Sequence, residues 1–368
     1  MKILELFSGI GGFCKGFTDA DYLFSEHYFS EIDKNAIANY KYNFKNAKYI
    51  GDVREVNGRI YEGIDILTFG SPCQDFSIAG KRNGLDGNRS GLIREAIRII
   101  KEAQPRVFIW ENVKGTFSSN ARRDFWAILQ AFANIGNYHI EWQLLNTKWL
   151  LPQNRERIYL VGILGYEGSS IVFPFRENDN VFTKSKQSNG GQSQTKLCCT
   201  TINPKFGSRA DDTFIQVGDF RYDDGFRPRK DGICPTLLDN SGRGMSGFPI
   251  ISLKNVTRTG SSDVRIGDGT DLAYLRHRNK RGRFHRGTAP TIDTSNNQGV
   301  VLGENLIRKL TEIECERLQG FPDDWTKFGD FENQIKEIPK TQRYKMIGNA
   351  VTTALVKEIA NRLKPILL

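Results

Sequence analysis

The amino-acid sequence predicts an α/β protein, a doubly wound parallel sheet into which an irregular, β-rich basic module is inserted. Over residues 1–165, short apolar runs alternate with amphipathic helical patterns, as is typical of a parallel sheet covered by helices on both faces. Residues 171–300 break this pattern, since they hold six of the twelve prolines, 15 of the 36 glycines and no long helical pattern. After Leu306 the helical spacing returns. We therefore expect both ends of the chain to build one domain around the insert.

The individual strands and helices follow from hydrophobic spacing. Short β-rich runs predict strands at 3–7, 27–30, 49–50, 65–69, 106–110, 140–145 and 158–163. Helical spacing predicts helices at about 13–20, 33–45, 92–100 and 350–363. One more helix is expected to begin after Thr311, because Thr311 and Glu314 have the spacing of a capping box.

The composition excludes several classes of protein. With 368 residues, 24 of them Phe and 12 Tyr, the chain can bury a large core and needs no disulfide scaffold. No apolar run approaches the roughly 20 residues of a membrane span, and residues 3–6 are too few and too charged for a signal-peptide core. The six cysteines form no CxxC pair and no metal-ligand spacing with histidine. We expect a reduced, cytoplasmic compartment and no metal site.

The positive charge is concentrated in the insert. The chain has a formal net charge of +10, and residues 171–300 hold 20 basic against 13 acidic side chains. The densest run, at 276–286, contains six basic side chains and no acid. A solvated surface is one interpretation of such a run. A polyanionic partner is the better one, because uncompensated like charges destabilise the fold unless a partner neutralises them.

A glycine-rich turn after the first predicted strand points to a cofactor. Residues 7–13 place Gly9, Gly11 and Gly12 at a strand-to-helix turn, where the backbone can approach a ligand closely. Glu31 follows Gly9 by 22 residues, about where an acid meets a ribose diol, and Asp52 ends the third strand. This pattern favours an adenosine-containing cofactor. A tight turn with solvated acids is the alternative, and a dinucleotide is disfavoured because the spacing is Gly-x-Gly-Gly.

Reactive side chains follow three other strands. Cys73 comes after the fourth strand and Glu111 ends the fifth, so both fall at the carboxyl edge, where open α/β sheets bind ligands. Arg155 and Arg157 precede the last strand and project to one side if that segment is extended. The four side chains are therefore expected to converge on one pocket. A structural ion pair between Glu111 and the arginines is the alternative.

Together, these motifs resemble those of DNA cytosine-5 methyltransferases of the bacterial or phage restriction-modification type. The matching blocks follow the order of that family and lie at 7–12, 72–74, 111–113, 153–157, 317–322 and 348–351. The resemblance implies a Rossmann-like, S-adenosylmethionine-dependent methyltransferase domain made of residues 1–168 and 305–368, with a target-recognition domain at 169–304. It implies methyl transfer to carbon 5 of a flipped-out cytosine in double-stranded DNA.

The resemblance also implies a role for each reactive residue. Cys73 would add to C6 of the cytosine, and Glu111 would protonate N3. Arg157 would hold O2, and Arg155 would support the thiolate and phosphate side. Asn112 would buttress the loop that carries Cys73, and Gln74 belongs to the same catalytic group.

By the same resemblance, S-adenosylmethionine is the methyl donor and S-adenosylhomocysteine the product. One departure is Ile32, an aliphatic residue where some members have a tryptophan. The expected cofactor-binding residues are Phe7, Ser8, Gly9, Ile10, Gly11, Gly12, Glu31, Ile32, Asp52, Val53, Pro72, Leu92, Asn349 and Val351.

The sequence also leads to expectations about the protein's partners, its location and alternative functions. The chain is expected to be a monomer in the bacterial cytoplasm, associated with the nucleoid, with a companion restriction endonuclease as a possible partner. The segment 77–90 is a candidate loop that closes over the base. The alternatives are an RNA (tRNA) cytosine methyltransferase on the same fold, or a DNA-binding module without activity. The expected DNA-binding residues are Arg227, Arg229, Arg243, Arg276, Arg278, Lys280, Arg281, Arg283 and Arg286.

Overall fold

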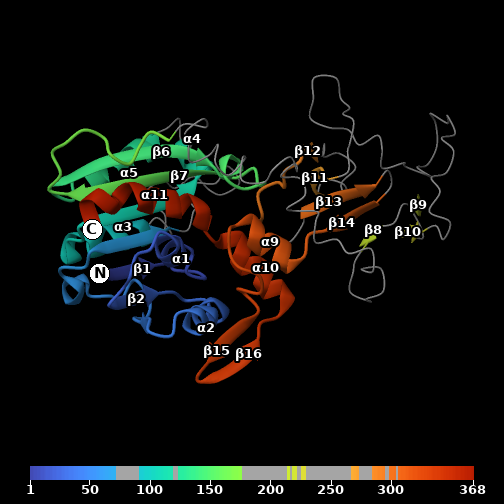
Figure 1. Ribbon diagram of the computed structural model, residues 1–368, viewed down its shortest axis with the longest axis horizontal. Helices are drawn as coiled ribbons and strands as arrows, with labels where there is room; N and C mark the ends of the chain where they lie inside the picture. Colours follow the sequence, from blue (N-terminus) through green and yellow to red (C-terminus); the bar gives the residue numbers. More distant parts are fainter. Residues whose placement is uncertain are drawn as a thin grey trace.

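A seven-stranded sheet forms the centre of the larger part of the molecule (Figure 1). The computed structural model describes residues 1–71, 91–118, 123–175, 214–215, 218–221, 225–228, 267–272, 284–294, 298–303 and 306–368. The strand order is β3-β2-β1-β4-β5-β7-β6. These strands are β1 (Lys2–Leu6), β2 (Glu26–Ser30), β3 (Lys48–Tyr49), β4 (Ile66–Gly70), β5 (Val107–Val113), β6 (Tyr138–Asn146) and β7 (Glu156–Leu164).

The expectation of an entirely parallel sheet is wrong at β7. Strands β1 to β5 pair in parallel, but β7 runs antiparallel to both β5 and β6. The connection from β6 to β7 spans only residues 147–155 and includes a 3-10 turn, η4 (Thr147–Trp149), so it is too short for a parallel crossover. The reversal brings the beginning of β7 to the carboxyl end of β5, where Arg157 lies opposite Val113.

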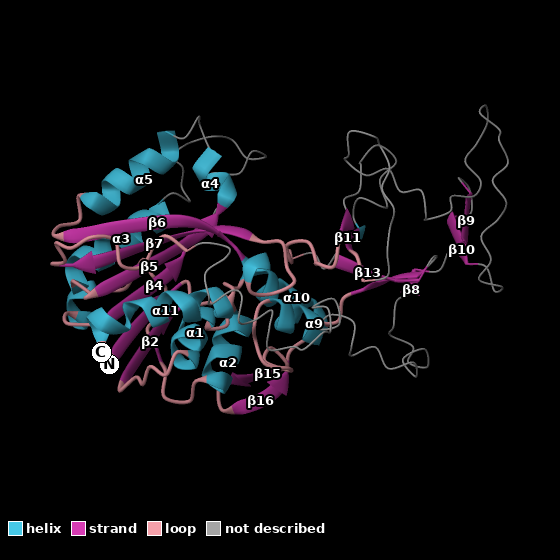
Figure 2. Ribbon diagram, turned by 45° about the horizontal axis from the view of Figure 1, so that its top comes forward, coloured by secondary structure: helices cyan, strands magenta, loops and turns pink. Residues whose placement is uncertain are grey.

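Helices cover both faces of this sheet (Figure 2). On one face, α1 and α11 share a core with the sheet that includes Phe17, Ile109 and Ile359. On the other face, α3 and α5 contribute Ile99 and Phe132 to a second core. The two ends of the chain therefore share one hydrophobic core. The helices of this part are α1 (Gly12–Asp19), α2 (Lys34–Asn43), η1 (Gly58–Tyr61), α3 (Gly91–Ala103), α4 (Lys114–Ser118), α5 (Arg123–Ala133) and α11 (Thr353–Leu367).

The C-terminal region begins with the predicted capping box. The Thr311 hydroxyl accepts a hydrogen bond from the Glu314 amide, and the Glu314 carboxylate accepts one from the Thr311 amide, at the start of α9 (Glu312–Leu318). The hydrophobic spacing did not predict helix α10 (Lys340–Asn349), or the hairpin of β15 (Phe328–Phe331) and β16 (Gln334–Glu337) that packs beside α2 (Figure 1).

A second, antiparallel sheet lies beyond α9 and α10 from the large sheet (Figure 1). Its strand order is β12-β11-β13-β14-β8, and a separate pair is formed by β9 and β10. All of these strands are short, as the turn-rich sequence of this region indicated. They are β8 (Phe214–Ile215), β9 (Gly218–Arg221), β10 (Gly225–Pro228), β11 (Gly269–Asp271), β12 (Phe284–His285), β13 (Gln298–Gly303) and β14 (Leu306–Lys309).

Membrane-spanning helices and disulfides, neither of which the sequence predicts, can be examined only where the structure describes the chain. No helix in the described ranges has the length and apolar character needed to cross a membrane. Cys14 and Cys315 are buried free thiols, as expected for these two residues.

The buried histidine of β2 predicts a stability change in acid. Burial lowers the pKa of His27 to about 4, whereas an unfolded histidine has a pKa of about 6.5. Below pH 6.5 the unfolded chain therefore binds a proton that the folded chain excludes. The free energy of unfolding should fall by up to about 3 kcal/mol as the pH drops from 6.5 towards 4.

Urea unfolding of the wild type and of His27→Gln at pH 7.0 and 4.5 tests this expectation. The variant loses the contact between Nε2 and the Tyr40 hydroxyl (2.6 Å), so it should be less stable at pH 7.0. Its free energy of unfolding should also change less between the two pH values. An equal change in both proteins would show that His27 does not cause the loss.

Candidate active site

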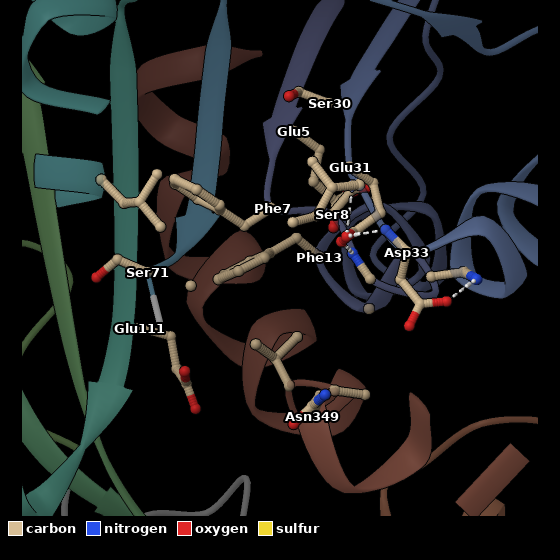
Figure 3. Close-up of a pocket in the computed structure, with 18 of the residues that line it drawn as sticks. Glu5, Phe7, Ser8, Phe13, Ser30, Glu31, Asp33, Ser71, Glu111 and Asn349 are labelled. Carbon is tan, nitrogen blue, oxygen red and sulfur yellow. Dashed lines mark hydrogen bonds between the residues drawn. The ribbon is translucent and has the colours of Figure 1, made fainter. Parts of the chain in front are cut away.

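A cavity of about 800 Å³ opens at the carboxyl ends of β1, β2, β4 and β5 (Figure 3). The start of α3 and residues 345–351, around the end of α10, form its other walls. Most of the predicted site residues that the structure describes line this cavity. They are Phe7, Ser8, Gly9, Gly12, Glu31, Ile32, Asp52, Val53, Leu92, Glu111, Asn112, Arg155, Arg157, Asn349 and Val351.

Two predicted cofactor residues do not line the cavity. Ile10 is fully buried and packs with Phe321 and Met346 in a separate small core. Gly11 is needed for the turn, because its φ is 80° and a Cβ there would lie 2.3 Å from the Phe44 ring. These two residues shape the glycine-rich turn from behind.

The carboxylate of Glu31 holds the glycine-rich turn against the end of β2. It accepts hydrogen bonds from the amides of Gly9 (2.9 Å), Ile32 (2.7 Å) and Asp33 (2.9 Å). Ile32 is 70% exposed at the rim, so an aliphatic surface is open to a ligand there. The acid and the turn therefore form one wall of the cavity.

Two further acids at this wall are paired with cations. Asp52 bonds Nη2 of Arg54 at 2.5 Å, and this hydrogen bond is the main cause that lowers the pKa of Asp52. Asp33 caps α2 and also bonds the Lys345 ammonium at 2.6 Å, which connects α2 to α10 across the cavity.

Glu111 and Arg157 meet at another wall of the cavity. Glu111 Oε1 lies 3.1 Å from Arg157 Nε, and both side chains are largely buried. Glu111 pairs with Tyr159 in the β5–β7 register, so Glu111 and Arg157 are diagonal neighbours on one face of the sheet. The contact has ion-pair distance but not hydrogen-bond geometry, and Glu111 Oε1 has no hydrogen-bond partner within the described part of the chain.

Arg155 is buried and faces backbone carbonyl groups. Its guanidinium donates to the carbonyl oxygens of Ala350 (2.8 Å), Gly348 (3.3 Å) and Ile292 (3.4 Å). Burial is the main cause that lowers its pKa, and the charge of Arg157 adds to the effect. Arg155 therefore connects the start of β7 with the end of α10 and with the segment at 292.

Asn112 and Trp110 fix the chain where β4 ends. Asn112 Nδ2 and Trp110 Nε1 both donate to the Ser71 hydroxyl, at 3.1 and 3.0 Å. Asn112 Oδ1 in turn accepts from the Val113 amide and the Thr116 hydroxyl. Ser71 lies two positions before Cys73, so these contacts hold the beginning of the segment that carries Cys73.

Most of the remaining predicted residues lie outside the described part of the chain. Two of the predicted DNA-binding arginines lie in the described ranges: Arg286 is exposed beside β12, and only the backbone of Arg227 is described, in β10. The following lie outside the described residues: Pro72, Cys73, Gln74, Arg229, Arg243, Arg276, Arg278, Lys280, Arg281, Arg283 and the loop 77–90.

Several residues that line the cavity were missed by the sequence interpretation. Glu5 and Phe13 are close in sequence to the glycine-rich turn, and Lys345 lies three positions before the recognised block at 348–351. Their closeness in sequence to these motifs was the feature from which their place in the cavity could have been predicted. The set consists of Glu5, Phe13, Ser30, Asp33, Ala36, Arg54, Gly70, Ser71, Gly91, Glu95, Val113, Lys345, Met346, Gly348 and Ala350.

The site combines two chemical environments. The wall around Glu31 offers backbone amides, acids and an aliphatic rim, which suit a sugar and a planar base. The wall around Glu111 offers a carboxyl group and a guanidinium, which can donate to and accept from a polar ring. Among the described residues, no group of three or more His, Cys, Asp or Glu side chains could hold a metal ion.

Comparison with known proteins identifies the family. Residues 1–365 match the model of the C-5 cytosine-specific DNA methylases. The chain is 29% identical to the Type II methyltransferase M.Bsp6I of Bacillus sp. (strain RFL6), over 99% of this chain and 98% of that protein. It is 30% identical to the Type II methyltransferase M1.ScrFI of Lactococcus lactis subsp. cremoris, over 100% and 78%.

A solved structure shows the same fold. The Entamoeba histolytica methyltransferase EhMeth superposes with a TM-score of 0.60 at 16% identity, covering 100% of this chain and 99% of that one. Since the family model matches nearly the whole chain, this protein is a member of the C-5 cytosine-specific DNA methylase family and a DNA methyltransferase.

Proposed function

We propose that the enzyme transfers a methyl group from S-adenosylmethionine to carbon 5 of a flipped-out cytosine in a specific double-stranded DNA sequence. The observation that carries the proposal is that Glu111 and Arg157 line the same cavity as Glu31 and the glycine-rich turn. In one and the same cavity, the carboxyl group of Glu111 and the guanidinium of Arg157 can bind a base. The carboxylate of Glu31 and the backbone amides of the glycine-rich turn can bind an adenosyl group.

The cavity fits S-adenosylmethionine. The Ser8 hydroxyl is buried at the wall without a hydrogen-bond partner among the described residues, so a polar ligand group can satisfy it. Glu31 would bind the ribose, and Ile32, Asp52 and Val53 would surround the adenine. When bound, the cofactor supplies an electrophilic methyl group. The other residues proposed to hold it are Phe7, Gly9, Gly12, Pro72, Leu92, Asn349 and Val351.

The proposed reaction is covalent. The Cys73 thiolate forms a bond to C6 of the cytosine while N3 takes a proton from Glu111, so that C5 becomes nucleophilic. After C5 has been methylated, solvent removes the C5 proton and the sulfur–C6 bond breaks. The ring then regains its double bond, Cys73 leaves as a thiolate, and Glu111 recovers its proton from N3.

The other residues would position these groups. Arg157 would bind O2 of the base and, at 3.1 Å from Glu111 Oε1, would keep the Glu111 carboxyl group in position. Asn112 would keep the Cys73 segment in place through Ser71. Arg155 would fix the start of β7, and with it Arg157, through its three carbonyl partners. Gln74 would act beside the nucleophile.

DNA recognition is proposed for residues 169–304, between two parts of the catalytic domain at 1–168 and 305–368. The base must leave the stack to reach the cavity, at a cost of a few kcal/mol. Basic side chains of this region would bind phosphates or read base edges in the major groove. Residues 276–286 carry six of them without an acid.

Replacing Arg278 or Arg283 by alanine should weaken DNA binding. Each variant removes one cation from the basic run, so the slope of log K against log [salt] should decrease by about 0.9 for a phosphate contact. Fluorescence anisotropy at several salt concentrations measures both quantities. Lys364→Ala, which removes a half-buried cation near the C-terminus that pairs with Asp21, is the control. Unchanged affinity and slope would contradict the assignment.

The proposed biological role is protection of host DNA in a restriction-modification system, by an enzyme that is monomeric and cytoplasmic. Named relatives are Type II methyltransferases, which supports this role. Bisulfite sequencing of a plasmid from cells that express the protein tests the function directly. We expect protected cytosines within one short sequence context. Complete conversion of every cytosine, with methylation of RNA instead, would refute the DNA substrate.

A further inference from the structure

Six carboxyl groups line the cavity, and four of them are paired with a cation. Glu5 and Glu31 are the exceptions, since neither has a cationic partner among the described residues. Both are held instead by backbone amides, and Glu5 also by a hydroxyl group. The four ion pairs are Asp33–Lys345, Asp52–Arg54, Glu95–Arg98 and Glu111–Arg157.

Glu5 is the more buried of the two exceptions. Its side chain leaves β1 beneath the glycine-rich turn, where it is 1% exposed, and Figure 3 shows it near Glu31 and Ser8. Oε2 accepts hydrogen bonds from the Tyr40 hydroxyl (2.8 Å) and from the Cys14 amide (3.3 Å). It thus lies between β1, the first turn of α1 and the middle of α2.

The groups around Glu5 leave it without a compensating charge. Burial raises the pKa of Glu5 to about 8, so the apoprotein holds a large share of this carboxyl protonated at neutral pH. Burial also raises the pKa of Tyr40 and of Cys14, and lowers that of His27 behind Tyr40, so all three are neutral. Glu31, at the end of β2, acts on Glu5 as a like charge.

We propose that Glu5 makes the cavity distinguish the cationic methyl donor from the neutral product. The inference rests on the proposed function and adds a specificity-determining residue to it. A sulfonium carries a positive charge that the product thioether lacks. A buried carboxyl group without a cationic partner gains most from such a charge, because Coulomb interactions are strong where water is excluded.

A proton accompanies this change of charge. When the cationic donor binds, Glu5 releases its proton to solvent and becomes the counter-charge. When the methyl group has left, the sulfonium charge is gone, although the ammonium group common to donor and product remains, and the Glu5 carboxylate takes up a proton from solvent again. The product then loses an electrostatic contribution that the donor had, and the cavity releases it more readily.

A purely structural role makes a different prediction. As a cap of α1, Glu5 would hold the turn for both ligands, so its loss would weaken donor and product equally. Glu5→Gln separates the two roles, because the amide oxygen can still accept from Tyr40 and Cys14 while the negative charge is removed. Glu141→Gln is the matched control, since Glu141 is a buried carboxylate that accepts three amides far from the cavity.

Isothermal titration calorimetry with S-adenosylmethionine and S-adenosylhomocysteine tests the proposal without DNA. At pH 7.5, Glu5→Gln should bind the donor roughly tenfold more weakly and the product within about twofold of wild type. Titrations in buffers of different ionisation enthalpy count protons. The wild type should release more protons than Glu5→Gln on binding the donor, and the same number on binding the product.

The outcomes separate this inference from the proposed function. Failure of the wild type to bind S-adenosylmethionine would overturn both. Binding of the donor with an unchanged donor-to-product preference in Glu5→Gln would overturn only the role of Glu5. If that variant does not fold, Tyr40→Phe decides, because loss of a hydrogen bond to the carboxylate raises its pKa. Proton release by the donor should then peak at higher pH, and an unchanged profile refutes the proposal.

Discussion

Replacing Cys73 by serine should reduce the rate of methyl transfer by at least about a thousandfold while DNA binding persists. A serine hydroxyl does not ionise near neutral pH, whereas a thiol has a pKa of about 8.5 that neighbouring cations lower further. The substitution removes the ionisable nucleophile and changes the size of the side chain little. Single-turnover transfer of a labelled methyl group measures the loss.

Covalent capture makes this test specific. With DNA that carries 5-fluorocytosine, the C5 position cannot lose a proton, so the sulfur–C6 bond should persist under denaturing conditions. The wild type should form this adduct and Cys73→Ser should not. Cys315→Ala, which changes a buried thiol in another core, should form it as the wild type does. An adduct with Cys73→Ser would refute the assigned nucleophile.

Hydrophobic periodicity predicted the strands of the large sheet but not the direction of one of them. The run at 158–163 has the same apolar character whichever way it runs, because side chains alternate identically in parallel and antiparallel strands. The direction of β7 depends on the short connection after β6, which the sequence interpretation did not weigh. That direction brings Arg157 to Glu111, and the convergence of these two residues was nevertheless expected from the motifs.

The partners of buried side chains were beyond prediction from the sequence. Arg155 was grouped with the reactive residues, yet its hydrogen bonds go to carbonyl oxygens at 292, 348 and 350, far away in the chain. Glu5 looked like one polar residue in a buried strand. Its contacts with Tyr40 and Cys14 depend on how α1 and α2 pack on β1, and no local pattern encodes that packing.

Replacing Glu111 by glutamine should lower the rate of methyl transfer by about 10²- to 10⁴-fold, the usual contribution of a general acid. The amide cannot give a proton to N3, so negative charge would accumulate on the ring as the thiolate adds. The amide group has nearly the size of the carboxyl group and can still lie beside Arg157 Nε, which is 3.1 Å from Glu111 Oε1 in the wild type. The substitution therefore tests the proton more than the position of the arginine.

Glu156→Gln is the matched control for this prediction. Glu156 is also a carboxylate at the start of β7, but it is more exposed and pairs with Lys114 at 2.7 Å outside the cavity. Its variant should keep a rate within a few-fold of wild type and a similar melting temperature. If Glu111→Gln binds DNA and cofactor normally and still transfers the methyl group at nearly the wild-type rate, another group protonates the base. The convergence of Glu111 and Arg157 would then serve to hold the cytosine rather than to activate it.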